Sequence, residues 1–242
     1  MPGLLSPAPS QPAEEQVSFD AKGALAGAKR VLPLAFSDLA FGLVFGVLAR
    51  QAGLSVLEVF LMSGLVFAGS AQLIVLSLWI VPLPIGTILL TTLIVNLRYL
   101  LMGAAVSQWF TRLSSLKAYA TLFFLADENW ALMVSEFEGG KRNAAFLLGS
   151  GLVLLTSWVS STVLGRILGG AVHNPSQWGL DFVFTAMFLA LLVGLWKGKA
   201  DLLPWVVAAL VAVAAAHWLP GKWYILLGGV AGSLVGVVRH AD

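Results

Sequence analysis

The chain has 242 residues, of which 59% are hydrophobic and only 11% are charged. Soluble domains average about 45–50% apolar and about 25% charged residues, so this composition excludes an ordinary soluble globule and a disordered chain. The formal net charge is only +2, from 14 basic and 12 acidic side chains, which excludes a nucleic-acid-binding protein. What remains is an all-α membrane protein, a bundle of helices that crosses the bilayer many times.

The N-terminal 28 residues differ from the rest of the chain. Prolines and glutamates recur between Met1 and Ser18 without an apolar run, which excludes the pattern of a secretory signal. We expect residues 1–28 to form a flexible tail and then an interfacial segment, with a short helix over Asp20–Arg30 whose basic side chains face lipid headgroups. Residues 29–242 then form a single transmembrane domain.

Long apolar runs follow the tail, each near the roughly 20 residues that a spanning helix needs. One further segment, Ala118–Ser135, is apolar at both ends and polar in the middle, so it is either another span with a broken centre or a re-entrant segment. The apolar runs lie at Val31–Ala49, Leu57–Val81, Ile85–Val106, Ala144–Leu168, Leu180–Trp196, Leu202–Leu219 and Lys222–Val238.

The distribution of basic residues decides between these alternatives. If Ala118–Ser135 crosses, most Lys and Arg side chains at the span ends lie on the same side of the membrane as the N-terminus. If it does not cross, the excess moves to the opposite side. The positive-inside rule therefore predicts about eight transmembrane segments, some of them discontinuous, with both termini in the cytoplasm.

Ionisable side chains within the spans are the most informative residues, because a charge at the centre of a spanning helix costs about 2.5–3.5 kcal/mol. Asp38 lies in the first predicted span and is either a proton or amine site, or a helix cap or interhelical contact. Asn96 and Arg98 lie deep in the third span. Because Arg98 cannot lose its proton, it either clamps a substrate carboxylate or pairs with an acid of another helix, and Asn96 adds amide donors.

Three consecutive polar residues, Asp127, Glu128 and Asn129, occupy the centre of Ala118–Ser135. Successive side chains on a helix point about 100° apart, so one continuous peripheral helix would turn some of them toward lipid. A discontinuous helix that lines a cavity avoids this cost, with one carboxylate free to couple protons and the other to pair with Arg98. The alternative is an extramembrane loop between two short hydrophobic helices.

Small residues interrupt the second predicted span at Phe67–Gln72, and Ser63 precedes them on the same run. They indicate either local unwinding that turns backbone groups toward a ligand, with Gln72 as donor and acceptor, or a small-residue packing face. We take Ser63, Gly69, Ser70 and Gln72, together with Asn96 and Arg98, as candidate binding residues. A separate stripe of Gly228, Gly232 and Gly236 predicts helix packing, against an internal neighbour or a partner subunit.

No pattern in the sequence indicates catalysis. No histidine lies in the middle of a span to activate Ser70, and phosphate-loop, dinucleotide and H-E-x-x-H motifs are missing. The chain contains no cysteine, which excludes thiolate chemistry and disulfides. We therefore expect neither an enzyme nor a bound metal or cofactor.

The polar blocks within the spans resemble those of the AzlC family, also called the YgaZ or branched-chain amino acid exporter family. The blocks AGSAQ, NLRYLLMG and ADE occur in this order, and the resemblance runs from about Leu32 to Val238. Many relatives have histidine where Tyr99 stands, so a histidine-based mechanism is in doubt for this chain. The matching segments are Phe41–Gln72, Thr91–Gly103, Leu125–Leu132 and Leu180–Val193.

The resemblance implies export of leucine, isoleucine and valine, and sometimes methionine, across a prokaryotic plasma (inner) membrane. It also implies coupling to the proton gradient and a small AzlD-type membrane subunit as partner. For such a substrate, we expect Asn96 and Arg98 to bind the carboxylate. We expect the break at Gly69–Gln72 to contact the substrate through backbone groups. Asp38, Asp127 and Glu128 are the candidates for proton coupling or an ion pair. The alternative is a channel or membrane scaffold that acts through its partner.

Overall fold

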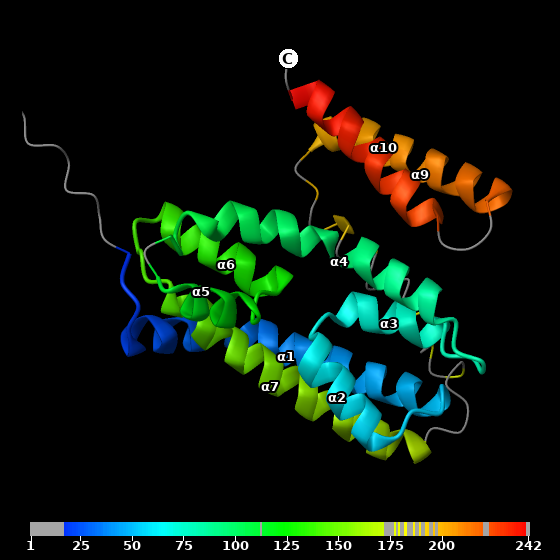
Figure 1. Ribbon diagram of the computed structural model, residues 1–242, viewed down its shortest axis with the longest axis horizontal. Coiled ribbons are helices and arrows are strands. Elements are labelled where there is room, and N and C mark those ends of the chain that lie inside the picture. Colours follow the sequence, from blue (N-terminus) through cyan, green and yellow to red (C-terminus); the bar gives the residue numbers. More distant parts are fainter. Residues whose placement is uncertain are drawn as a thin grey trace, which may run out of the picture. The chain divides into compact units, whose positions relative to one another are not determined.

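The computed structural model describes residues 17–111, 113–171, 198–219 and 223–240, with a few single positions between 177 and 196. This part of the chain is helical and contains no strand, although Ser18 and Asn143 form an isolated bridge (Figure 1). Residues 1–16 of the predicted tail and most of the predicted span Leu180–Trp196 lie outside it. The helices are α1 (Ala21–Gln51), α2 (Val56–Val66), α3 (Gly69–Ser77), α4 (Ile85–Ser107), α5 (Ser115–Leu122), α6 (Asp127–Glu138), α7 (Ala145–Leu168), α9 (Leu202–Trp218) and α10 (Trp223–His240), with short 3₁₀ turns at Gly169–Ala171 and Lys199–Asp201.

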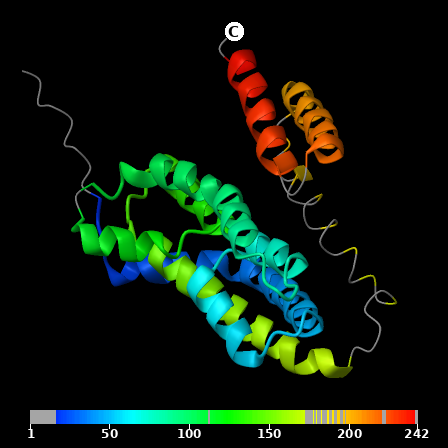
Figure 2. The ribbon, with the colours of Figure 1, turned by 45° about the vertical axis from the view of Figure 1, so that its right-hand side comes forward.

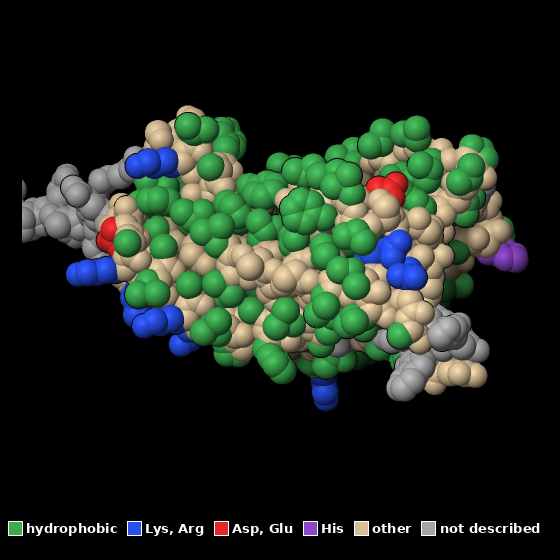
Figure 3. All heavy atoms as spheres, turned by 90° about the horizontal axis from the view of Figure 1, so that it is seen from below, with side chains coloured by type: hydrophobic (Ala, Val, Ile, Leu, Met, Phe, Trp, Pro, Cys, Tyr) green, Lys and Arg blue, Asp and Glu red, His purple; other side chains and the backbone are tan. Residues whose placement is uncertain are grey.

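Four segments of the described chain are long and apolar enough to cross a membrane. They are α1, α4, Ala145–Ala171 and Lys199–Trp218, while α2 and part of α10 are shorter apolar helices. Hydrophobic side chains also cover much of the face shown in Figure 3, as expected for a surface in contact with lipid. The prediction of an all-helical membrane protein is therefore confirmed, and the number of about eight crossings stays a prediction.

The helix α1 corrects one expectation from the sequence. We expected a short interfacial helix over Asp20–Arg30 before the first span, and the structure instead has one helix of 31 residues that continues through Pro33. The carboxylate of Asp20, just before α1, accepts a hydrogen bond from the Gly23 N–H at 2.9 Å. Since Asp38 lies in the interior of α1, the alternative that it caps a helix N-terminus is wrong.

The described chain divides into two compact units, and the first contains residues 17–34 and 101–154. Here α1 and α7 pack closely, because a Cβ added at Gly149 would lie 1.8 Å from the carbonyl oxygen of Ala24. Trp109 stacks on Phe137 of α6 with ring centroids 4.1 Å apart. These contacts bury Phe137 and set the position of α6 within this unit.

The second unit contains residues 35–100 and the described residues from 155 to 240. Its part of α1 packs against α7, because a Cβ at Gly46 would lie 2.1 Å from the carbonyl oxygen of Thr162. Phe41 and Phe45 of α1 contact the Trp158 ring at centroid distances of 5.7 and 5.6 Å. This packing fixes Trp158 of α7, which becomes important in the candidate site.

The helices α9 and α10 form a hairpin, with the two helices side by side in both ribbon views (Figures 1 and 2). A Cβ added at Gly228 would lie 2.9 Å from the carbonyl oxygen of Ala208, and one at Gly232 would lie 2.8 Å from the Cβ of Ala208. At Gly228 and Gly232 the predicted small-residue stripe therefore packs on an internal neighbour, α9.

Candidate functional site

The second predicted span, Leu57–Val81, is interrupted. The helix α2 ends at Val66 and α3 begins at Gly69, so Phe67 and Ala68 separate two short helices. Phe67 has a φ of 44°, in the left-handed region that a bulky residue rarely adopts. The interruption falls within the segment Phe67–Gln72, where the sequence left local unwinding and a small-residue packing face as alternatives. A Cβ at Gly69 would lie only 3.1 Å from the Trp158 ring, so the glycine also allows α3 to approach α7 closely.

A buried network of hydrogen bonds holds this break. The Oε1 atom of Gln72 accepts from the backbone N–H of Ala68 at 3.3 Å and from the Trp158 indole N–H at 3.0 Å. The Gln72 Nε2 atom donates to Ser63 Oγ at 3.3 Å, and Ser63 Oγ also accepts from Thr162 Oγ1 at 2.9 Å. Gln72 is 1% exposed and Trp158 is 3% exposed. The network therefore ties α2, α3 and α7 together at the break in a water-poor interior.

The third predicted span places a cation beside the same break. Arg98 of α4 donates through Nη2 to Ser70 Oγ at 2.8 Å and to the Tyr99 hydroxyl at 3.3 Å. Its guanidinium carbon lies 5.0 Å from the centroid of the Tyr99 ring. Ser70 belongs to the first turn of α3, where unpaired backbone N–H groups carry a partial positive charge. A guanidinium and a helix N-terminus together favour a bound anion.

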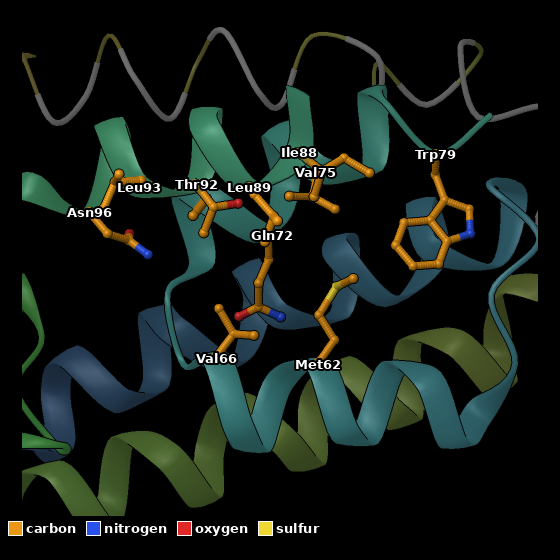
Figure 4. Close-up of a pocket in the computed structure, with 11 residues that line it drawn as sticks. Met62, Val66, Gln72, Val75, Trp79, Ile88, Leu89, Thr92, Leu93 and Asn96 are labelled. Atoms are coloured by element: carbon orange, nitrogen blue, oxygen red, sulfur yellow. The ribbon is translucent and has the colours of Figure 1, made fainter. Parts of the chain in front are cut away.

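A pocket of about 500 Å³ lies between α2, α3 and α4, and both Gln72 and Asn96 line it (Figure 4). The Oδ1 atom of Asn96 is buried and has no hydrogen-bond partner among the described residues. A buried carbonyl oxygen without a donor costs about 1–3 kcal/mol, so this atom favours a ligand that supplies an N–H or O–H group. The candidate site thus contains a cation, an unsatisfied acceptor and an apolar cavity.

The segment Ala118–Ser135 is also interrupted, in the first compact unit. The helix α5 ends at Leu122, and α6 begins at Asp127 with Asp127 and Glu128 in its first turn. Asn129 is fully buried, and its Oδ1 accepts from the Ala126 N–H at 2.8 Å while its Nδ2 donates to the Phe124 carbonyl at 2.7 Å. Asp127 is half-buried and Glu128 is exposed.

The same type of hydrogen bond stabilises both helix interruptions. In each, a buried amide side chain in the first turn of the downstream helix accepts a hydrogen bond from the backbone N–H of the alanine that precedes that helix. Gln72 does this at Ala68, and Asn129 does it at Ala126. This interaction satisfies one donor that an interrupted helix leaves without a partner. Each compact unit therefore contains one broken segment with the same local stabilisation.

The structure brings together most of the predicted binding residues. Ser63, Ser70 and Gln72 surround the first break, and Arg98 reaches it from α4. Asp38 lies half-buried in α1 of the same unit, and its role in proton coupling stays a prediction. The pairing of Arg98 with Asp127 or Glu128 also stays a prediction.

Sequence reasoning missed two members of the network, both on α7. Trp158 and Thr162 bind Gln72 and Ser63, which come from a distant part of the chain. The available signal was an indole near the middle of an apolar run, beside hydroxyl residues at 157 and 160–162. Such a cluster within a spanning helix marks polar contacts between helices, although it does not name the partner.

These features define a class of protein: a membrane protein built of helices, with a buried polar site at an interrupted helix. The family model described as "AzlC protein" matches residues 33–172, and the chain belongs to this family. The resemblance seen in the polar blocks is thereby confirmed.

Several named relatives agree with this assignment. The chain is 27% identical to the inner membrane protein YgaZ of Escherichia coli (strain K12), over 97% of this chain and 95% of that protein. It is 31% identical to an uncharacterized membrane protein of Archaeoglobus fulgidus, over 69% and 73% respectively. It is 25% identical to the branched-chain amino acid transport protein AzlC of Bacillus subtilis (strain 168), over 68% and 65%. No solved structure matches the chain.

Proposed function

We propose that this protein is a secondary transporter that exports branched-chain or similar hydrophobic amino acids across a prokaryotic plasma membrane. One relative carries the name of a branched-chain amino acid transport protein, and the family assignment supports transport for this chain. The observation that carries the proposal is the position of Arg98, hydrogen-bonded to Ser70 in the first turn of α3. A cation at the broken end of a helix within an apolar protein suits a substrate that carries a carboxylate.

The site can recognise both charged groups of an amino acid. The guanidinium of Arg98 and the N-terminus of α3 bind the carboxylate, since both present donors and positive charge. Asn96 was expected beside the carboxylate as well, but its Oδ1 atom is a buried acceptor without a hydrogen-bond partner among the described residues. We therefore assign Asn96 to the substrate ammonium, which supplies the donor that this oxygen needs.

Coupling to protons requires a group that titrates. The resemblance implies that many relatives have histidine where Tyr99 stands, so this chain either does without that histidine or uses a carboxylate. For the second case, Asp38, Asp127 and Glu128 are the candidates. In this proposal residues 29–242 act as one transport domain with both termini in the cytoplasm. A small AzlD-type membrane protein assembles with the domain, and transport is driven by the proton gradient.

Export from whole cells tests the proposal. Cells that express the protein with its small neighbouring membrane subunit are loaded with leucine-containing dipeptides, and the appearance of leucine in the medium is followed. The Arg98→Ala variant is expected to lose export, and Arg98→Lys to retain a small part, because lysine keeps the charge and loses the planar fork. Arg30→Ala is the matched control, since Arg30 is exposed on α1.

Two results would contradict the proposal. Wild-type export by a correctly inserted Arg98→Ala variant would show that Arg98 does not bind the substrate carboxylate. If the Asp38→Asn, Asp127→Asn and Glu128→Gln variants all export at the wild-type rate, none of these carboxylates couples transport to protons. Membrane insertion of each variant is measured in the same cells, so a folding defect is not mistaken for a transport defect.

A further inference from the structure

The pocket beside the broken helix has strongly uneven walls. Its apolar lining comes from Met62 and Val66 of α2, Val75 of α3, and Ile88, Leu89 and Leu93 of α4. The polar lining is limited to the side chains of Gln72, Thr92 and Asn96, and none of the lining residues is charged. A charged group placed among the apolar lining residues, away from Asn96, would lose its hydration without gaining a partner, so this part of the pocket suits an uncharged apolar group.

Asn96, whose buried Oδ1 atom lacks a hydrogen-bond partner among the described residues, lies at one end of the pocket. Figure 4 shows Asn96 and Trp79 at opposite ends of the lining, with aliphatic side chains between them. Ile88, Leu89, Thr92, Leu93 and Asn96 follow one face of α4, and with a helical rise of about 1.5 Å per residue this face extends about 12 Å from Ile88 to Asn96. The pocket is thus apolar along its length and offers a hydrogen-bond acceptor at one end.

Gln72 lines the same pocket, but its amide group already forms hydrogen bonds within the protein. Its carbonyl oxygen accepts from Ala68 and Trp158, and its amide donates to Ser63. The acceptor left for a ligand is therefore Asn96, which precedes Arg98 by two residues on α4. Arg98 is not among the lining residues, but it donates to Ser70, which directly precedes the lining residues Ala71 and Gln72 on α3. A ligand with its polar end at Asn96 extends its apolar end toward Trp79.

We propose that this pocket receives the apolar side chain of the transported amino acid and sets the length of side chain that the protein accepts. The inference rests on the proposed function and adds to it the residues that select the substrate. Thr92 and Leu93 lie beside the first carbons of the side chain, and Leu89 lies at mid-depth. Val75 and Trp79 form the far wall. The substrate class is aliphatic and thioether amino acids, and the volume of about 500 Å³ leaves room for side chains longer than that of valine.

A homologous series of inhibitors tests the pocket. Alanine, norvaline and norleucine, which differ by two and then one methylene, compete with labelled leucine in proteoliposomes that contain the protein and its small subunit. Each buried methylene contributes about 0.8 kcal/mol, so inhibition is expected to strengthen about fourfold per methylene in the wild type. In Leu89→Trp the increase should stop before norleucine, because the indole fills the mid-depth of the pocket. In Met62→Ala, phenylalanine should become a better inhibitor because the side wall is removed.

Leu90→Trp is the matched control, because Leu90 adjoins Leu89 on α4 but does not line the pocket. It should keep the wild-type order of inhibitors. The inference is overturned if Leu89→Trp and Met62→Ala transport leucine and keep the wild-type order, or if Leu90→Trp changes the order equally. Failure of the wild type to transport any aliphatic amino acid would instead overturn the proposed function. The two failures are therefore distinguishable.

Discussion

Replacing Gln72 by leucine removes the centre of the buried network while keeping a side chain of similar size. The substitution eliminates the hydrogen bonds of Gln72 to Ala68, Trp158 and Ser63. Ser63 still accepts from Thr162, so its oxygen keeps a partner. The backbone N–H of Ala68 and the indole N–H of Trp158 lose the acceptor that they share, in a region from which water is largely excluded.

The expected cost follows from these two orphaned donors. A buried donor without a partner costs about 1–3 kcal/mol, whereas hydrogen bonds between membrane helices average about 0.6 kcal/mol. With two orphaned donors, we expect Gln72→Leu to lower the free energy of unfolding by about 1–6 kcal/mol. Leucine is also unable to hold the Ala68 N–H, so the break itself should loosen. Amide hydrogen exchange at Ala68 should therefore accelerate more than exchange in the middle of α4.

Unfolding in mixed micelles, followed by circular dichroism, measures the global effect, and hydrogen exchange with mass spectrometry measures the local one. Gln51→Leu is the matched control, because Gln51 is exposed at the end of α1 and its replacement should change stability by about 0.5 kcal/mol or less. Equal stability losses in the two variants, with unchanged exchange around the break, would refute the view that Gln72 holds the interruption.

Three further predictions follow from the structure. Asn129→Leu should loosen the start of α6 as Gln72→Leu loosens α3, and faster amide exchange at Ala126 checks this; unchanged exchange would contradict the shared role of this hydrogen bond. Gly69→Val should lower the melting temperature well beyond Gly86→Val, because a Cβ at Gly69 lies 3.1 Å from Trp158 whereas one at Gly86 has no neighbour within 4 Å; equal losses would contradict the packing. The Gly23 N–H and then Asn143 hold the pKa of Asp20 below its ordinary value of 3.8, so the stability that Asp20 adds is present above that pH and is lost as the pH falls through the lowered pKa. The difference in melting temperature between wild type and Asp20→Ala should therefore shrink in acid, and a difference that grows in acid would contradict the assignment.

Local composition marked two places where the described chain departs from continuous helix, without deciding what happens there. The small residues of Phe67–Gln72 left unwinding and a packing face open, and the polar triplet Asp127–Asn129 left a broken span, a re-entrant segment and a loop open. The structure interrupts the helix at Phe67 and Ala68, and again between Leu122 and Asp127. By contrast, the sequence predicted a separate short helix over Asp20–Arg30, and the structure continues α1 from Ala21 through Pro33 to Gln51.

The sequence could not predict which side chains from different helices form hydrogen bonds with each other in the site. Which indole meets Gln72, and which hydroxyl meets Ser63, depends on how α7 lies against the broken helix, and that register is set by tertiary packing. The sequence placed Asn96 at the carboxylate because an amide can donate as well as accept. Only the structure shows that its oxygen lies buried without a partner among the described residues. Donor and acceptor roles of an amide are decided by its surroundings.

The most direct test of the account is uptake of labelled leucine by proteoliposomes that contain the protein, its small subunit and an imposed proton gradient. If Arg98 binds the substrate and protons drive transport, leucine uptake should be saturable, should collapse when the gradient is dissipated, and should be lost in Arg98→Ala but not in Arg30→Ala. Linear flux that does not saturate, persists without a gradient and is unchanged in Arg98→Ala would contradict it.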